Sequence, residues 1–293
     1  MSKLLYYLLL QPLSKLPLPA LYVLSDLLRF VLYRMVGFRK KVVFTNLRNA
    51  FPELSEAERR RIAGRFYRHF CDLLVESVRM FSMGKEEVLR RCRLVNPELV
   101  QEFARQGKSL IIAAGHYSNW ELAAVSYGIQ SDHTVVGIYK PLANPFFDRV
   151  LQASRGRFGM ELLPKQNVKP FFAENTGRLT ATLFATDQSP TSRNRAYWTR
   201  FLNQDTAVLF GAENYARKYG YPLVYGKIRK LRRGYYEMEF ETIAAEPEQL
   251  PVGEITERHT RVLERLILEA PEYWLWSHKR WKRQREPIDE QQG

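Results

Sequence analysis

Apolar and polar residues alternate at helical spacing near the start of the chain. On a helical wheel one side of residues 21 to 35 is apolar and the other is polar. The apolar side carries Leu21, Leu24, Leu28, Val31, Leu32 and Met35, and the opposite side carries Asp26, Arg29 and Tyr33. This pattern predicts an amphipathic helix. It favours a helix lying in a membrane interface, with Arg34, Arg39, Lys40 and Lys41 toward lipid phosphates, and it also fits a helix packed on a protein core.

The first 36 residues are the most apolar stretch of the chain, yet three prolines interrupt them. A helix that spans a membrane needs about 20 mostly apolar residues, so this stretch does not predict one clean span. It does not resemble a cleavable signal either, because no small-residue cleavage site precedes the basic cluster at 39 to 41.

Further along the chain, the pattern predicts alternating helices and strands. Residues 55 to 82 predict a helix that starts with a capping box of Ser55 and Glu58. The apolar runs 109–114 and 179–186 predict strands, and residues 223 to 243 predict a hairpin that turns near 232–234. Strands separated by helices indicate an α/β fold.

Charge and cysteine content narrow the possible partners. The formal net charge of +14 predicts a surface that attracts phosphates, anionic headgroups or an acidic carrier protein. Cys71 and Cys92 stand far apart in the sequence, which predicts two free thiols in a reducing cytoplasm.

The candidate chemistry lies in the segment GHYSNWE, after the strand at 109–114. His116 follows the strand end, where ligands of α/β proteins gather, and a helix that can start at Ser118 carries Glu121 one turn on. Histidine can accept a proton near neutral pH, and a carboxylate on its other nitrogen would fix the tautomer. The same spacing also fits a capping box from Ser118 to Glu121 with no catalytic role.

Other catalytic and binding motifs are missing from the sequence. It has no nucleophile elbow, no phosphate-binding loop, no dinucleotide fingerprint and no pair of histidines at metal spacing. We therefore expect neither a metal nor a cofactor. Near the C-terminus, three tryptophans alternate with Lys and Arg between 274 and 285, a composition typical of a lipid interface, a single-stranded nucleic-acid site or a solvated basic tail.

The chain carries an ordered set of further motifs: RKKVVFTNLRNAFPELSEAE (39–58), GHYSNWE, an Arg in the segment around 155 to 159, the pair Asp187-Gln188, FLNQDTAVLFGAE and PEYWLWSHKRWK. This set resembles the bacterial lipid A biosynthesis acyltransferase family across residues 30 to 283. Many family members have Gly or another small residue where this chain has Ser118.

The resemblance implies an α/β fold like that of glycerolipid acyltransferases, with a central mixed sheet flanked by helices and a membrane-associated N-terminal helix. The expected division is a membrane-associated segment at 1–37 and an acyltransferase domain at 38–293. It also implies a cytoplasmic-facing enzyme of the inner membrane, acyl carrier protein as the acyl donor and a glycolipid acceptor. We expect no nucleic-acid partner, because the sequence carries no recognisable nucleic-acid fold signature.

The resemblance further implies roles for individual residues. His116 acts as the general base, Glu121 orients its ring, and Arg155 stabilises the oxyanion, with Arg157 or Arg149 as alternatives. Asp187 and Gln188 position the acceptor or brace the site. Asn119 and Arg157 complete the expected substrate-binding set. Three alternatives remain open: a related acyltransferase for another glycolipid or an aminolipid, a basic membrane-binding protein without catalytic activity, and a basic RNA- or DNA-binding protein.

Overall fold

A central sheet of seven strands organises the structure, a computed structural model that describes residues 2–174, 177–191 and 196–285. The strand order is β1-β9-β8-β2-β5-β3-β4, and every neighbouring pair is parallel except the β8–β9 hairpin. The strands are β1 (Cys92–Leu94), β2 (Leu110–Ala114), β3 (Thr134–Tyr139), β4 (Glu161–Pro164), β5 (Thr180–Ala185), β8 (Leu223–Arg232) and β9 (Tyr235–Ala244). The expected α/β fold with a mixed central sheet is confirmed.

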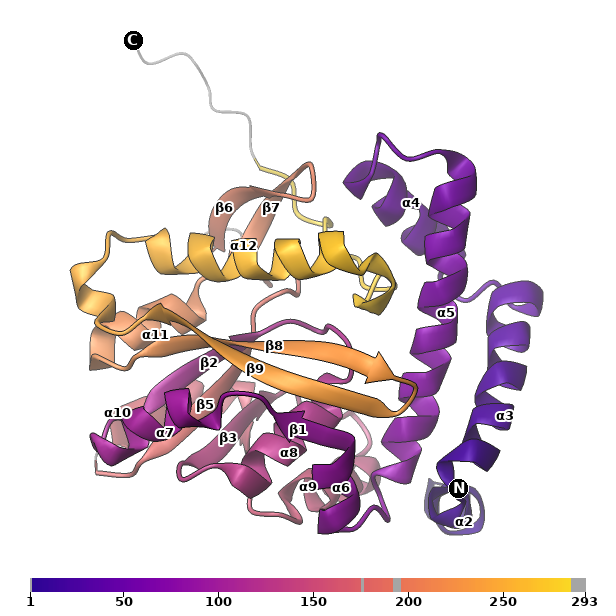
Figure 1. The fold of residues 1–293 in the computed structure, drawn as a ribbon, viewed down its shortest axis with the longest axis horizontal. Helices are drawn as coiled ribbons and strands as arrows, with labels where there is room; N and C mark the ends of the chain where they lie inside the picture. The colour runs from indigo at the N-terminus through magenta and orange to yellow at the C-terminus, as the bar shows by residue number, and fades with distance from the viewer. Residues whose placement is uncertain (1, 175–176, 192–195, 286–293) are drawn as a thin grey trace.

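Helices cover both faces of this sheet (Figure 1). One face packs against α11 (Gly211–Tyr219) and α12 (Glu254–Glu269), and the other against α6 (Lys85–Arg91), α7 (Pro97–Arg105) and α8 (Trp120–Gln130). The remaining helices beside the sheet are α9 (Pro145–Gly156) and α10 (Val168–Glu174). A separate antiparallel pair, β6 (Ala196–Phe201) and β7 (Gln204–Leu209), lies above α12 in the view of Figure 1.

The helix α5 (Glu56–Arg79) crosses the sheet at the end where β8 finishes. It begins at the predicted capping box, in which Ser55 and Glu58 satisfy each other's backbone amides. Its buried carboxylate Glu76 accepts hydrogen bonds from Tyr22, Asn119 and Tyr236, at 2.8, 2.6 and 2.7 Å. Burial raises the pKa of Glu76, against the effect of its hydroxyl donors. One carboxylate thus ties α5 to an N-terminal helix, to the loop after β2 and to the sheet.

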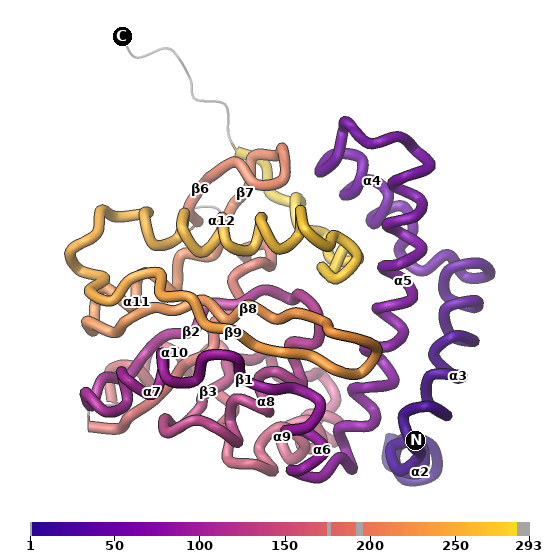
Figure 2. The backbone as a smooth tube through the Cα atoms, in the orientation of Figure 1, coloured from indigo at the N-terminus to yellow at the C-terminus, as the bar shows by residue number. Residues whose placement is uncertain are grey.

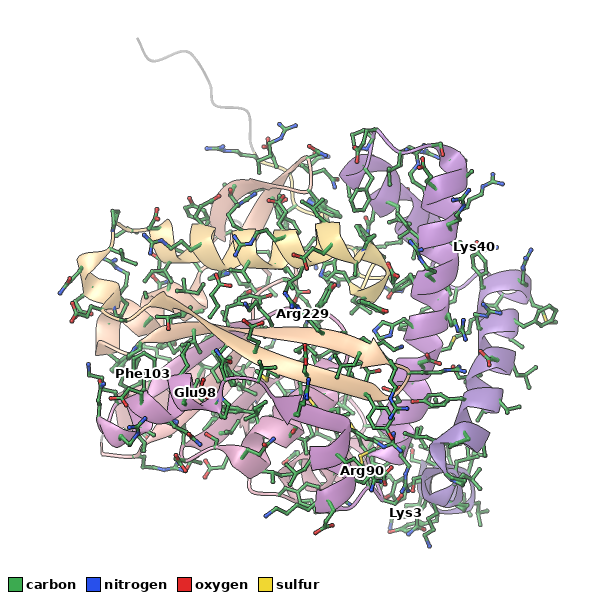
Figure 3. All side chains as sticks on the ribbon, in the orientation of Figure 1. Lys3, Lys40, Arg90, Glu98, Phe103 and Arg229 are labelled. Carbon is green, nitrogen blue, oxygen red and sulfur yellow. The ribbon has the colours of Figure 1, made fainter. Side chains whose placement is uncertain are left out.

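Short helices of α and π type build the N-terminal segment: α1 (Ser2–Leu5), η1 (Tyr6–Leu10), α2 (Gln11–Lys15), α3 (Leu18–Arg29) and η2 (Phe30–Met35), followed by α4 (Lys40–Ala50). The tube in Figure 2 shows α3 alongside α5. They run antiparallel, since Tyr22 bonds Glu76 and Ser25 bonds Asp72. Lys40, labelled in Figure 3, places its ammonium 4.6 Å from the ring centre of Tyr33.

The predicted apolar side of residues 21 to 35 is largely used for packing within the protein. Leu21 is buried, and Leu24 and Leu28 are partly buried in the same cluster beside α5. Met35 of the predicted side is exposed, and so are three apolar side chains outside it, Val23, Leu27 and Phe30. None of the helices in the described residues is both long and apolar enough to cross a membrane. Membrane association of this segment therefore stays a prediction, and the exposed set would carry it.

We expect Glu76→Ala to lower the free energy of unfolding by at least about 3 kcal/mol, because it leaves two buried donors and one partly buried donor without their acceptor. Urea denaturation measures the change. Glu76→Gln keeps one acceptor oxygen and should lose less than the Ala variant. Equal losses in the two variants would mean that side-chain volume, not hydrogen bonding, stabilises this position.

Candidate active site

Two strand ends bring His116 and Asp187 together. The strands β2 and β5 are parallel neighbours, and Ala114 stands opposite Ala185 in their register. His116 and Asp187 each follow two residues later, so they leave the same edge of the sheet side by side. Gly115 lies between strand and histidine, where a Cβ would come 2.8 Å from Leu263 Cδ1 of α12.

Asp187 is a buried carboxylate that accepts three hydrogen bonds. Its Oδ1 lies 2.7 Å from His116 Nδ1, and its Oδ2 accepts from the backbone N–H of His116 and from the indole of Trp274, both at 2.9 Å. These bonds fix both the backbone and the ring of the histidine. They also place the Nδ1–H tautomer of the neutral ring toward Asp187, which leaves the lone pair on Nε2.

His116 and Asp187 each stabilise the charged form of the other. Burial disfavours the imidazolium, but the charge and hydrogen bond of Asp187 outweigh it and raise the pKa of His116 above its usual 6.5. Burial also opposes ionisation of Asp187, yet its interactions with His116 and Trp274 lower the carboxyl pKa to about 2. Asp187 is therefore ionised at neutral pH, ready to stabilise a protonated ring.

Gln188 lies at the other side of the imidazole. Its Nε2 is 3.2 Å from His116 Nε2, the distance of a hydrogen bond from the amide to the ring lone pair. A half-turn of the amide would present its carbonyl oxygen to the N–H of an imidazolium instead. The side chain can thus contact either protonation state of the ring.

Glu121 has a different partner from the one expected. Its carboxylate pairs with Arg155, whose Nε and Nη2 donate to Oε2 and Oε1 at 2.8 and 2.5 Å. Trp120 donates its indole N–H to the same carboxylate at 3.2 Å and meets the His116 ring edge to face, with ring centres 5.1 Å apart. Asp187 is thus the carboxylate that orients the His116 ring. The prediction that Glu121 orients the ring does not match this geometry. Glu121 and Arg155 still lie close enough to affect the pKa of His116, in opposite directions.

The other expected substrate-binding residues have structural partners. Asn119 is buried, caps α8 by accepting from the Leu122 amide, and donates to Glu76. The cap is therefore Asn119, and the capping box predicted from Ser118 to Glu121 is wrong. Ser118 has a φ of 58°, a left-handed conformation that explains why Gly suits this position. Arg157 donates to the backbone carbonyls of Met80, Phe81 and Met83.

The C-terminal tryptophans contribute to this site and to the core. Trp274 and Trp276 are 2% and 0% exposed, and Arg280 is 3% exposed. The backbone of this segment pairs with the loop after β2, where the Leu275 amide donates to the His116 carbonyl at 3.2 Å. Trp274 and Trp276 therefore cannot form a lipid belt or stack on bases. The hydrogen bond from the Trp274 indole to Asp187 was not predicted, because the sequence alone does not show which carboxylate an indole contacts.

Comparison with known proteins defines the class: the chain is an acyltransferase. It belongs to the bacterial lipid A biosynthesis acyltransferase family, whose model matches residues 2–283.

Individual relatives align over most of the chain. It is 26% identical over 279 residues to the lipid A biosynthesis lauroyltransferase of Escherichia coli K12, covering 94% of this chain and 89% of the relative. It is 22% identical over 271 residues to the palmitoleoyltransferase of the same organism, covering 92% and 87%. The myristoyltransferase of that organism matches at 26% over 150 residues, 51% of this chain and 46% of the relative.

We expect the ring of His116 to titrate above pH 6.5 in the wild type, because Asp187 stabilises the imidazolium. Asp187→Asn removes that charge, so burial should then lower the midpoint below the wild-type value. Histidine ring NMR measures both midpoints. Because burial lowers the pKa of His278, that ring should titrate below 6.5 in the wild type. A His116 midpoint that does not change in Asp187→Asn would contradict the pairing.

Proposed function

We propose that this protein transfers a fatty acyl group from a thioester of acyl carrier protein to a hydroxyl of a lipid A precursor, at the cytoplasmic face of the inner membrane. The reaction is a late, secondary acylation in lipopolysaccharide biosynthesis. Family membership supports the lipid A acceptor. The observation that carries the chemistry is the buried Asp187 carboxylate 2.7 Å from His116 Nδ1, which leaves Nε2 as a base at a strand end.

In the proposed reaction, His116 is the general base. Its Nε2 takes the proton of the acceptor hydroxyl while the hydroxyl oxygen attacks the thioester carbonyl carbon. Asp187 stabilises the imidazolium that forms. The tetrahedral intermediate then expels the thiolate of the carrier, which receives the proton from the imidazolium as the C–S bond breaks. The acyl group passes directly to the acceptor, so no acyl-enzyme forms.

The ion pair of Glu121 and Arg155 supplies the second part of the site. Nε and Nη2 of Arg155 are held by Glu121, and no hydrogen bond to a described residue occupies its Nη1. A guanidinium fixed in this way is a suitable donor for the oxyanion, since preorganised donors stabilise charge that develops in the transition state. Glu121 then positions Arg155, and Gln188 contacts the acceptor side of the ring. The proposal leaves out Asn119 and Arg157, whose polar groups have structural partners.

The nature of the two substrates fits the charge of the protein. An acidic carrier and an anionic glycolipid both need cationic contacts, and the chain has a formal net charge of +14. The relatives are named for lauroyl, palmitoleoyl and myristoyl transfer, so family membership does not define the chain length. A second candidate within the same chemistry is acylation of another glycolipid or an aminolipid, which the acceptor tested below distinguishes.

We expect purified enzyme to add the mass of one acyl chain to a lipid A precursor when supplied with acyl carrier protein thioesters. Mass spectrometry of the lipid measures the gain. His116→Ala and Asp187→Asn should lower kcat by about 10²–10⁴-fold, the usual effect of losing general-base function. Glu121→Gln and Arg155→Gln should each lower kcat by about 10²-fold or more, as for loss of an oxyanion donor.

Glu98→Gln on α7 is the matched control, because Glu98 is exposed and outside the site. It should retain wild-type activity. Acylation of other hydroxylated lipids but not of the lipid A precursor would contradict the acceptor and keep the transferase mechanism. Full activity in His116→Ala would contradict the mechanism itself.

The pH dependence of kcat/KM should report the same histidine. The base must be neutral, so the rate should fall as the pH drops through the raised pKa of His116, with a midpoint above 6.5. Asp187→Asn should shift this acidic limb to lower pH while it lowers the maximal rate. A limb that stays in place in the variant would show that another group controls it.

A further inference from the structure

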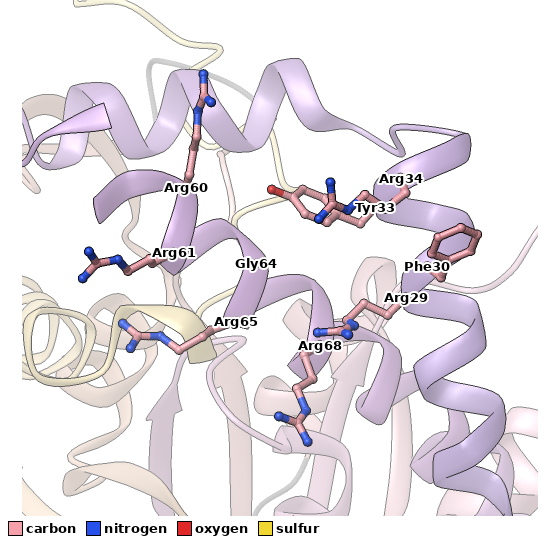
Figure 4. Close-up of a pocket in the computed structure, with 9 residues that line it drawn as sticks. All are labelled: Arg29, Phe30, Tyr33, Arg34, Arg60, Arg61, Gly64, Arg65 and Arg68. Atoms are coloured by element: carbon pink, nitrogen blue, oxygen red, sulfur yellow. The ribbon is translucent and has the colours of Figure 1, made fainter. Parts of the chain in front are cut away.

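A cavity lined with arginine separates the N-terminal helices from the first part of α5 (Figure 4). Its volume is about 800 Å³. Nine residues line it, and none of them is acidic: Arg29, Phe30, Tyr33, Arg34, Arg60, Arg61, Gly64, Arg65 and Arg68. The cavity has the size of a ligand site and an unusually uniform charge.

The arginines of this cavity are only partly neutralised by the protein. Arg60 pairs with Glu56 at 3.2 Å, and Arg65 pairs with Glu272 at 3.4 Å. The other four have no ion pair with any described residue: Arg29, Arg34, Arg61 and Arg68. Several guanidinium groups that line one hollow without a counter-charge repel one another, so an anion with several acceptor oxygens stabilises such a set.

Local geometry keeps the cavity open. The helices α3 and α5 are tied together at Ser25–Asp72 and Tyr22–Glu76, and the cavity lies beyond these bonds. On α5, positions 60, 61, 64, 65 and 68 share one helical face. Gly64 is in the middle of this face, and a Cβ built there meets no atom within 4 Å. The absent side chain is therefore part of what makes the space.

A stripe of exposed apolar side chains on α3 and η2 ends at the cavity. Val23, Leu27 and Phe30 follow one another at helical spacing on α3 and η2, and they are 72%, 59% and 56% exposed. Phe30 also lines the cavity. A cationic pocket bordered by an exposed apolar stripe matches a molecule with an anionic head and hydrocarbon chains, better than a free anion.

We propose that this cavity binds the phosphate of an anionic bilayer phospholipid, with the acyl chains of that lipid against the Val23–Leu27–Phe30 stripe. This is a defined lipid site, distinct from the active site and from general attraction of a basic surface to a charged membrane. It would anchor α3 and the start of α5 to the bilayer through one bound headgroup. The proposal does not depend on acyl transfer.

Vesicle co-sedimentation tests the proposal with the full-length protein. We expect tight binding to phosphatidylcholine vesicles that contain phosphatidylglycerol and weak binding to phosphatidylcholine alone. Arg61→Gln with Arg68→Gln should weaken binding to the anionic vesicles about thirtyfold, from the usual contribution of two cations near an anionic surface. Lys165→Gln with Lys169→Gln removes the same charge from exposed positions near α10 and should change binding by less than about twofold.

Filling the cavity without changing its charge distinguishes a site from a charged surface. Gly64→Trp keeps all six arginines and should weaken binding to the anionic vesicles about tenfold, because the indole fills the hollow in which one headgroup would contact several guanidinium groups at once. Gly64→Ala adds only a methyl group and should bind like the wild type. Circular dichroism and thermal melting confirm folding of each variant. Wild-type binding by folded Gly64→Trp would overturn the proposal in favour of diffuse electrostatic attraction.

Native mass spectrometry identifies the source of the phosphate. We expect one retained phosphatidylglycerol on the wild type and none on Gly64→Trp. If glycerol phosphate displaced that lipid at concentrations close to the lipid's own affinity, the acyl chains would contribute nothing and the lipid assignment would be overturned. His116→Ala should bind lipid like the wild type, so a failure of the proposed acyl transfer would leave this test unaffected.

Discussion

The site depends on the carboxylate of Asp187, which joins three segments that are far apart in the sequence. It follows β5, fixes the backbone and ring of His116 after β2, and accepts the indole N–H of Trp274 near the C-terminus. Its Oδ2 accepts both the His116 amide and the Trp274 indole, and neither donor has a second hydrogen-bond partner among the described residues. Because both Asp187 and Trp274 are buried, removal of either would leave a polar group unsatisfied. The position of the His116 ring therefore depends on the packing of the core around Asp187 and Trp274.

Sequence patterns located His116 correctly at the end of a strand, but not the carboxylate that holds it. Glu121 is close in the sequence and one helical turn away, which favoured it as the orienting group. Asp187 reaches the ring only because β2 and β5 are adjacent and in the register that sets Ala114 opposite Ala185. The hydrophobic periodicity predicts a strand but not which strands lie beside it. The order of strands in the sheet was therefore needed to decide whether Glu121 or Asp187 orients the ring.

The ambiguity near the N-terminus and the wrong interfacial prediction near the C-terminus have a common physical origin. Amphipathic spacing shows that one side of a helix avoids water, and both a protein core and a bilayer satisfy that requirement. In α3 the predicted apolar side packs beside α5, and other apolar residues are exposed. Near the C-terminus, tryptophan alternating with cations looked interfacial, whereas Trp274, Trp276 and Arg280 are buried. The helix α5 and the β8–β9 hairpin were predictable because a capping box and a turn are local signals.

The shared acceptor at Glu76 gives the molecule a mechanical connection between its N-terminus and its chemistry. Tyr22 of α3 and Asn119 of the loop that carries His116 donate to opposite oxygens of the same carboxylate. A force on α3, for example from a bilayer that holds its exposed side chains, would be transmitted to the loop that carries His116 through these two hydrogen bonds, which share Glu76 of α5. The strain on these hydrogen bonds would then depend on the surrounding lipid as well as on the protein.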